Sequence, residues 1–157
     1  VPKLNTEFQL RVSLRGHRAS RTVCLLGTHT LHDLHEVISV AFDRSDPHLY
    51  SFYFGTGGRG VVRSASAQGQ EYSIASLVSP RSEHPDPSVR SAARTTLDAL
   101  GLRVGQRFKY LFDFGDQWWH EIEVVRVGMA IVHGAKPRPL ILEGRGESPR
   151  QYDDLEG

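Results

Sequence analysis

The sequence contains one cysteine, Cys24, among its 157 residues. A single cysteine rules out an internal disulfide and any zinc cage built from several thiolates. No window approaches the roughly 20 consecutive apolar residues that a membrane-spanning helix needs, and no basic segment followed by an apolar run opens the sequence. These absences exclude the disulfide-stapled and membrane-spanning classes. They predict a cytoplasmic protein that does not contact a membrane.

A strong excess of one charge is also missing. Lysine and arginine number 19 against 18 acidic residues, a formal net charge of +1, which argues against a protein that binds nucleic acid mainly by electrostatic attraction. The basic residues are nevertheless gathered near the start of the chain. Because the guanidinium fork suits phosphate, we treat four arginines there as candidate nucleic-acid contacts, although a solvated surface gives the same pattern: Arg11, Arg15, Arg18 and Arg21.

Apolar residues recur with two different periods in the first third of the chain. They alternate with polar residues over 8–15, which predicts a half-buried strand, and the apolar run 22–26 is its expected antiparallel partner. Over 31–42 the apolar residues instead recur at helical spacing, and Thr30 precedes them as an N-cap. The sequence therefore predicts two strands followed by a helix.

Aromatic residues mark three further strands. Residues 49–54 form one such run, while 108–114 and 118–124 each alternate. The pair Gly115-Asp116 lies between the last two runs and predicts a tight hairpin turn.

The remaining segments are less regular. Residues 61–95 contain several prolines and predict a long surface connection. Residues 96–101 predict a short helix, or the end of a longer helix that begins at Ser88. The segment 137–157 is rich in proline, glycine and charge, and we expect it to be irregular.

Three stretches of this sequence resemble one family. LHDLHEVISVAF (31–42), HLYSFYF (48–54) and GQRFKYLFDFGDQWWHEIEV (105–124) are similar, in this order and spacing, to the plasmid pRiA4b Orf-3-like proteins, also known as passenger or TnpR-type proteins of transposable elements. The similarity covers about residues 7–127, and FDFGDQWWHEI is its most specific part. The resemblance implies an α+β fold: a curled, mostly antiparallel sheet with one main helix and one or two short helices.

The end of the chain departs from the family pattern. Family members usually carry cysteines and a Gly-Gly-Pro-Trp-Gly-Tyr-like run there, whereas this chain reads LEGRGESPRQYDDLEG. The tail is therefore a degenerate remnant of a single domain that we expect to cover 1–157. True resolvases need a nucleophilic serine among catalytic arginines, and because no such motif is visible, recombinase activity is not carried over.

The segment FDFGDQWWHEIE (112–123) concentrates the polar groups that could form a site. Alternation predicts one aspartate in the strand, on the face opposite its phenylalanines, and the other in the turn. One interpretation is purely structural, with the aspartates fixing the turn and the Trp and His packing a small core. The other is a binding pocket at the hairpin mouth, with a histidine approaching from the helix side. The candidate pocket residues are Asp113, Asp116, Trp118, His120, His35 and His48.

Histidine chemistry leaves some alternatives open. We expect His120 to be buried against a carboxylate, which would raise its pKa, and His35 to bond across the core. The order H-x-x-H-E at His32 is not the zincin order. A zinc site from His35, His48 and His120 with an aspartate is chemically feasible, but the spacing is not diagnostic. We therefore predict no metal ligands and no cofactor.

Two classes of function remain. The first is a non-enzymatic binding or adaptor domain of plasmid or transposon type that contacts nucleic acid or a protein partner. The alternative is a small metal- or carboxylate-dependent hydrolase that uses the Asp/His cluster of residues 112–120. The first is favoured because no complete catalytic motif is visible.

Overall fold

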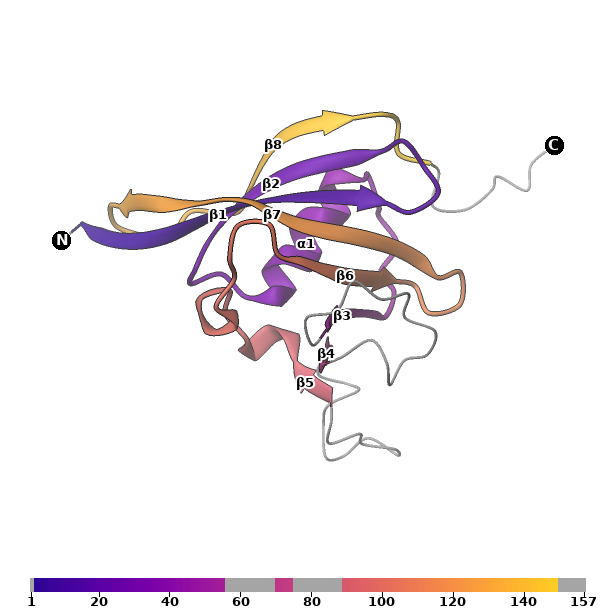
Figure 1. The fold of residues 1–157 in the computed structure, drawn as a ribbon, viewed down its shortest axis with the longest axis horizontal. Helices are drawn as coiled ribbons and strands as arrows, with labels where there is room; N and C mark the ends of the chain where they lie inside the picture. Colours follow the sequence, from indigo (N-terminus) through magenta and orange to yellow (C-terminus); the bar gives the residue numbers. More distant parts are fainter. Residues whose placement is uncertain (1, 56–69, 75–88, 150–157) are drawn as a thin grey trace.

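Strands with alternating apolar and polar residues form one eight-stranded sheet (Figure 1). The computed structural model describes residues 2–55, 70–74 and 89–149. The spatial order is β5-β4-β3-β6-β7-β1-β2-β8, with antiparallel neighbours except for β4 and β5, which are parallel. The strands are β1 (Lys3–Leu14), β2 (Ser20–Leu26), β3 (Tyr50–Phe54), β4 (Gln70–Ser73), β5 (Val89–Ser91), β6 (Arg107–Phe112), β7 (Trp118–Val132) and β8 (Leu140–Arg145).

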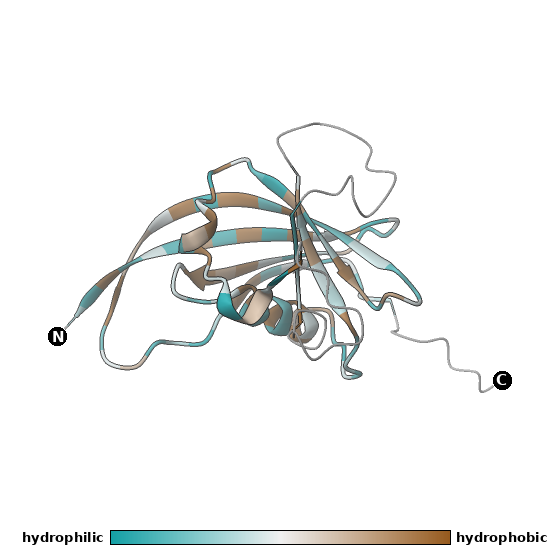
Figure 2. Cartoon of the chain, turned by 90° about the horizontal axis from the view of Figure 1, so that it is seen from below, coloured by the Kyte–Doolittle hydropathy of each residue, from teal (hydrophilic) through white to brown (hydrophobic). Residues whose placement is uncertain are grey.

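One α-helix, α1 (Leu31–Ala41), lies in the hollow of the curved sheet (Figure 2). Thr30 caps it as predicted: its hydroxyl accepts the backbone N–H of Asp33, and the Asp33 carboxylate accepts the backbone N–H of Thr30. This reciprocal cap satisfies two backbone donors that would otherwise lack partners. The described part of the chain contains no helix long and apolar enough to cross a membrane.

The inner face of the sheet and the buried side of α1 share one core. The strand residues alternate between this core and the outer face, as the brown and teal segments in Figure 2 show. The apolar periodicity of 31–42, 108–114 and 118–124 predicts that these segments share one core, and the structure confirms it for the following residues: Leu34, Ile38, Phe42, Phe108, Tyr110, Phe112, Ile122 and Val124.

The expected α+β class is wrong, because the fold is predominantly β. Among the described residues, one α-helix of 11 residues stands against an eight-stranded sheet, and the other helical turns in that part of the chain are the short 3-10 helices η2 (Ala92–Arg94) and η3 (Asp98–Leu100). The segment expected to be a long connection contains β4 and β5, and the alternative helix from Ser88 is excluded by β5. The tail expected to be irregular contains β8.

The missed strands have little sequence signal of their own. β5 has three residues, and all six residues of β8 are exposed. β8 is therefore held by pairing with β2 rather than by a buried face, and β5 buries only Val89 while it pairs with β4. Hydrophobic periodicity detects burial, so it does not detect such strands. The rest of the predicted connection and the end of the tail lie outside the described residues.

The core placement of Ile38 can be tested by substitution. Ile38 is completely buried, whereas Val40 on the same helix is 66% exposed. We expect Ile38→Ala to lower the free energy of unfolding by about 2–5 kcal/mol, because it removes buried methyl groups and leaves a cavity. Val40→Ala is the matched control and should change it by less than about 0.5 kcal/mol. Urea denaturation of both variants measures the difference, and equal stabilities would refute the placement.

Candidate functional site

The β6–β7 hairpin turns through five residues, Asp113 to Gln117, and Asp113 organises the turn. Asp113 has a left-handed backbone conformation (φ 62°), which ends β6 at Phe112. Its Oδ1 accepts the backbone N–H groups of Gly115 at 3.0 Å and Asp116 at 3.3 Å. The turn is longer than the predicted Gly115-Asp116 pair. The predicted strand position of Asp113 is wrong, because Asp113 lies in the turn, whereas Asp116 lies in the turn as predicted and is exposed.

Asp113 also faces His48, which lies in the connection between α1 and β3. Asp113 is only 8% exposed, and its Oδ2 lies 3.6 Å from Nδ1 of His48. The His48 ring meets Phe112 edge-on, with centroids 5.5 Å apart. The structure therefore brings these two candidate residues together at the hairpin mouth, where they join the turn to the connection that follows the helix.

His120 faces a cation instead of the expected carboxylate. It is fully buried, and its Nε2 lies 2.6 Å from Nη2 of Arg44. Since a guanidinium only donates hydrogen bonds, Nε2 must accept, and the ring proton sits on Nδ1 facing the Tyr110 carbonyl at 3.3 Å. Burial and the Arg44 charge lower the pKa of His120 to about 3. The predicted rise in its pKa is therefore wrong.

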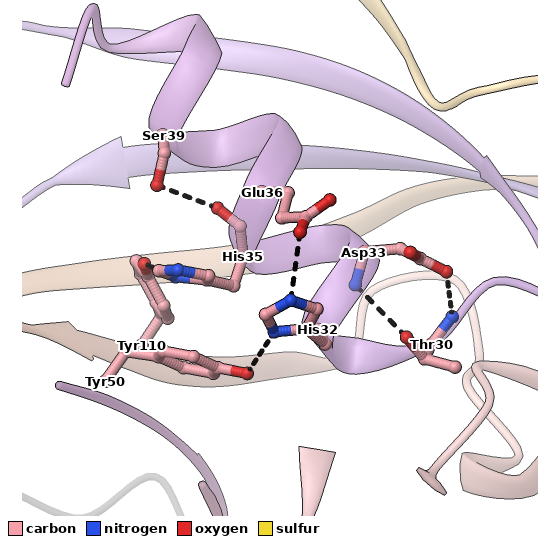
Figure 3. A network of polar contacts seen from close by, with 8 residues as sticks. All are labelled: Thr30, His32, Asp33, His35, Glu36, Ser39, Tyr50 and Tyr110. Carbon is pink, nitrogen blue, oxygen red and sulfur yellow. Dashed lines mark hydrogen bonds and ion pairs between the residues drawn. The ribbon is translucent and has the colours of Figure 1, made fainter. Parts of the chain in front are cut away.

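His35 bonds across the core as predicted (Figure 3). Its Nδ1 lies 2.6 Å from the Tyr110 hydroxyl, and its ring stacks on Tyr50 with centroids 3.8 Å apart. Burial, followed by the charges of His32 and Arg44, lowers the pKa of His35 to about 3. Burial also raises the pKa of the Tyr110 phenol. Both partners are therefore neutral near pH 7.

His32 makes a second line of contacts at the edge of this interface. Its Nδ1 lies 2.8 Å from the Tyr50 hydroxyl, and its Nε2 lies 2.9 Å from the Glu36 carboxylate (Figure 3). His32 and His35 thus bond to different tyrosines and do not converge. Within the residues that the structure describes, no three His, Cys, Asp or Glu side chains are placed to hold a metal ion.

Arg44 is the central residue that the sequence did not reveal. It follows the last turn of α1, where a lone arginine looks like an ordinary surface residue. Its guanidinium carbon lies 5.0 Å from the ring centroid of Phe42, 4.8 Å from that of Phe112 and 5.7 Å from that of Trp118. Burial lowers the pKa of Arg44 to about 10, so it is charged near pH 7. Arg44 therefore connects two candidate residues, Trp118 and His120.

The four candidate arginines do not share one face. Arg11 lies on the outer face of β1, where it pairs with Glu123 at 3.4 Å. Arg15 directly follows β1, and its guanidinium lies over the Trp119 ring. Arg21 lies opposite Val12 on β2 and turns to the helix side, where its Nε donates to the Ala41 carbonyl at 2.8 Å. Arg18 is exposed in the β1–β2 turn. Arg11 and Arg15 are exposed and can contact a partner, whereas the guanidinium of Arg21 donates to backbone carbonyls.

A hollow of about 330 Å³ opens on the outer face of the sheet, away from the hairpin mouth. It forms across β1, β2 and β8, where short hydroxyl side chains lie between longer charged ones. Short side chains between longer ones leave a depression in the surface of the sheet. The residues lining it are Arg11, Ser20, Thr22, Glu143 and Arg145.

The buried histidines should make folding depend on pH. In the folded chain the pKa of both His35 and His120 is about 3, against about 6.5 when unfolded. Above pH 6.5 both states are neutral. As pH falls from about 6.5 towards 3, only the unfolded state gains these protons, so each histidine lowers stability by up to about 1.4 kcal/mol per pH unit. Urea denaturation between pH 7 and pH 4 measures this slope.

His120→Gln should make the dependence of unfolding free energy on pH shallower, because the unfolded chain then takes up about one proton fewer than before. His133→Gln removes an exposed histidine and is the matched control. A slope that His120→Gln leaves unchanged would contradict the burial of a neutral imidazole at this position.

Comparison with known proteins identifies the family. The family model for plasmid pRiA4b ORF-3-like proteins matches residues 6–157. Uncharacterized protein y4hQ of Sinorhizobium fredii (strain NBRC 101917 / NGR234) is 30% identical over 129 residues, which cover 82% of this chain but only 56% of y4hQ. The crystal structure of a protein of unknown function, MM3350 from Methanosarcina mazei Go1, has a similar fold, with a TM-score of 0.65 and 17% identity over 94% of this chain and 73% of that one. The chain therefore belongs to the plasmid pRiA4b ORF-3-like family, as the three sequence stretches predicted.

Proposed function

We propose that this chain is a non-enzymatic binding module that contacts a phosphate-bearing partner through the outer face of its sheet. The proposed partner is nucleic acid, which the chain binds weakly. The observation that carries this proposal is the hollow across β1, β2 and β8. Arg11 and Arg145 lie on its two sides, and the hydroxyls of Ser20 and Thr22 lie between them. Guanidinium groups and hydroxyls are the side-chain donors that most often contact phosphate oxygens.

The strand register explains why these groups gather. Thr22 pairs with Arg11 on one side and Glu143 on the other, while Ser20 pairs with Arg145. Residues that are paired across strands point to the same face, so the donors project together. Glu143 bonds Arg145 at 3.1 Å, and this acidic neighbour limits the attraction for phosphate.

An aromatic platform lies on the same face. Arg15 stands over the Trp119 ring with its guanidinium carbon 5.5 Å from the centroid, and Trp119 lies 5.6 Å from the Tyr53 ring. A basic groove beside aromatic rings is typical of sites for single-stranded nucleic acid, where bases stack on the rings. Tyr53 is only 6% exposed and Trp119 is partly exposed, so Trp119 is the ring that a base could reach. This combination favours a nucleic-acid strand over an isolated phosphate ion.

The hydrolase alternative receives less support from the geometry. A hydrolase of that type needs a carboxylate or a metal-bound water beside a histidine that can accept a proton near pH 7. His35 and His120 have pKa values of about 3 and are bonded to Tyr110 and Arg44. Asp113 is bonded to its own turn. The candidate groups therefore have structural partners rather than catalytic ones.

Substitution of two outer-face arginines tests the proposal. We expect the chain to bind a fluorescent single-stranded oligonucleotide weakly and with a steep dependence on salt. Arg11→Ala combined with Arg15→Ala should weaken binding and reduce the slope of log affinity against log salt by about 0.7 for each phosphate that the chain no longer neutralises. Fluorescence anisotropy between about 50 and 200 mM salt measures both quantities.

Arg94→Ala combined with Arg103→Ala is the matched control, because these exposed arginines lie on η2 and the loop before β6. Equal weakening by both pairs would show that only net charge matters. Tight, salt-insensitive binding would also contradict the proposed role of this face.

A further inference from the structure

Arg44 carries a positive charge into the helix–sheet interface and has no counter-charge among the described residues. None of the ion pairs among the described residues includes it. One of its terminal nitrogens, Nη2, bonds His120, and within the same part of the chain the other, Nη1, is buried without a hydrogen-bond partner. Arg44 as a whole is only partly buried, but a buried donor without an acceptor costs free energy in the folded state. The screened Nη1 group therefore lacks an acceptor that a bound ligand could supply.

The surroundings of Arg44 stabilise the cation but do not neutralise it. The rings of Phe42, Phe112 and Trp118 lie about the guanidinium, and aromatic faces attract a cation. The hydrogen-bonded partner, His120, is a neutral acceptor. The result is a site with one positive charge, apolar walls and one donor group without an acceptor.

We propose that Arg44 is a receptor for a carboxylate, which accepts hydrogen bonds from Nη1 between the rings of Phe112 and Trp118. A carboxylate brings one negative charge and neutralises one guanidinium, which is the arrangement that arginine favours. A phosphate dianion would bury a surplus negative charge. The nearby Arg21 offers few free donors to a second ligand charge, because its Nε and Nη1 groups already donate to backbone carbonyls.

Trp118 is the side chain that a bound carboxylate would displace. Its ring is half-buried over Arg44, and the exposed His17 ring stacks on it with centroids 6.1 Å apart. Trp118 is also the first residue of β7, directly after the turn, so its ring can move without disturbing the rest of the ladder. Because Nη1 is screened from solvent, binding must change the surroundings of Trp118.

This inference is independent of the proposed nucleic-acid contact. Arg44, His120 and Trp118 lie on the inner side of the sheet with α1, whereas Arg11 and Trp119 lie on its outer face. Oligonucleotide binding can therefore fail while carboxylate binding succeeds, and the reverse.

Trp118 fluorescence provides the test. The chain has two tryptophans, so Trp119→Phe leaves Trp118 as the sole reporter. In this background, sodium acetate should cause a saturable change in emission at constant ionic strength, whereas sodium chloride should cause none and inorganic phosphate a weaker one. An N-acetylated dipeptide with a free C-terminus distinguishes the two sources of a carboxylate. Tighter binding of the dipeptide than of acetate indicates a peptide C-terminus, and weaker binding indicates a small free acid.

Substitution of Arg44 decides the assignment. Arg44→Met should abolish the acetate response, and Arg18→Met, which removes an exposed arginine, should leave it intact. If Arg44→Met does not fold, the ¹⁵N resonances of the Arg44 guanidinium in the unsubstituted chain should shift with acetate and not with chloride. A response that survives Arg44→Met, or guanidinium resonances that acetate leaves unmoved, would overturn the proposal.

Discussion

The joint between helix and sheet depends on Tyr110. It is completely buried on β6, its hydroxyl bonds His35 of α1, and its carbonyl faces Nδ1 of His120 on β7. Its ring also packs against Phe52 of β3, with centroids 4.7 Å apart. One residue thus contacts the helix and both neighbouring strands. Because a buried polar group without a partner is costly, the positions of both histidines follow from this residue.

The neutrality of that joint explains why Arg44 is different. Two histidines with pKa values of about 3 and a protonated phenol bring polar atoms into the interior without bringing charge. Such a network specifies geometry at little electrostatic cost. Arg44 adds a charge that the hydrogen bonds of the joint do not require, since a neutral donor could equally well satisfy Nε2 of His120. A charged residue that bonds a neutral partner and has no ion pair among the described residues is a candidate for binding.

The sequence predicted the elements with a long periodic face, and it missed the short strands β4 and β5 and the exposed strand β8. β1, α1 and the β6–β7 hairpin were predictable because each must present apolar residues to the core. β5 and β8 are held by a neighbouring strand, and pairing leaves almost no trace in the periodicity of the paired strand. These missed strands changed the fold class from the expected α+β to predominantly β.

The candidate site was predicted less well, because its partners are distant in sequence. The Asp113–His48 and His35–Tyr110 contacts join residues that are far apart in the sequence. His35 and Tyr110, for example, are 75 positions apart. The left-handed conformation at Asp113 could not be distinguished from a strand position, since Asp tolerates both. His120 was expected to meet a carboxylate, because nearby aspartates were visible while the approach of Arg44 was not. Local patterns thus identified which residues are buried but not which residues they meet.

The alternation of β7 places the two proposed sites on one strand. Trp118 and His120 point inward to Arg44, whereas Trp119 points outward to Arg15 and Tyr53. Successive residues of a strand face opposite sides, so the two tryptophans share a peptide bond but not a face. A rotation of the Trp118 ring therefore need not move Trp119, because the two rings lie on opposite sides of the same strand. The outer face and the Arg44 site remain chemically separate even though they use adjacent residues of β7.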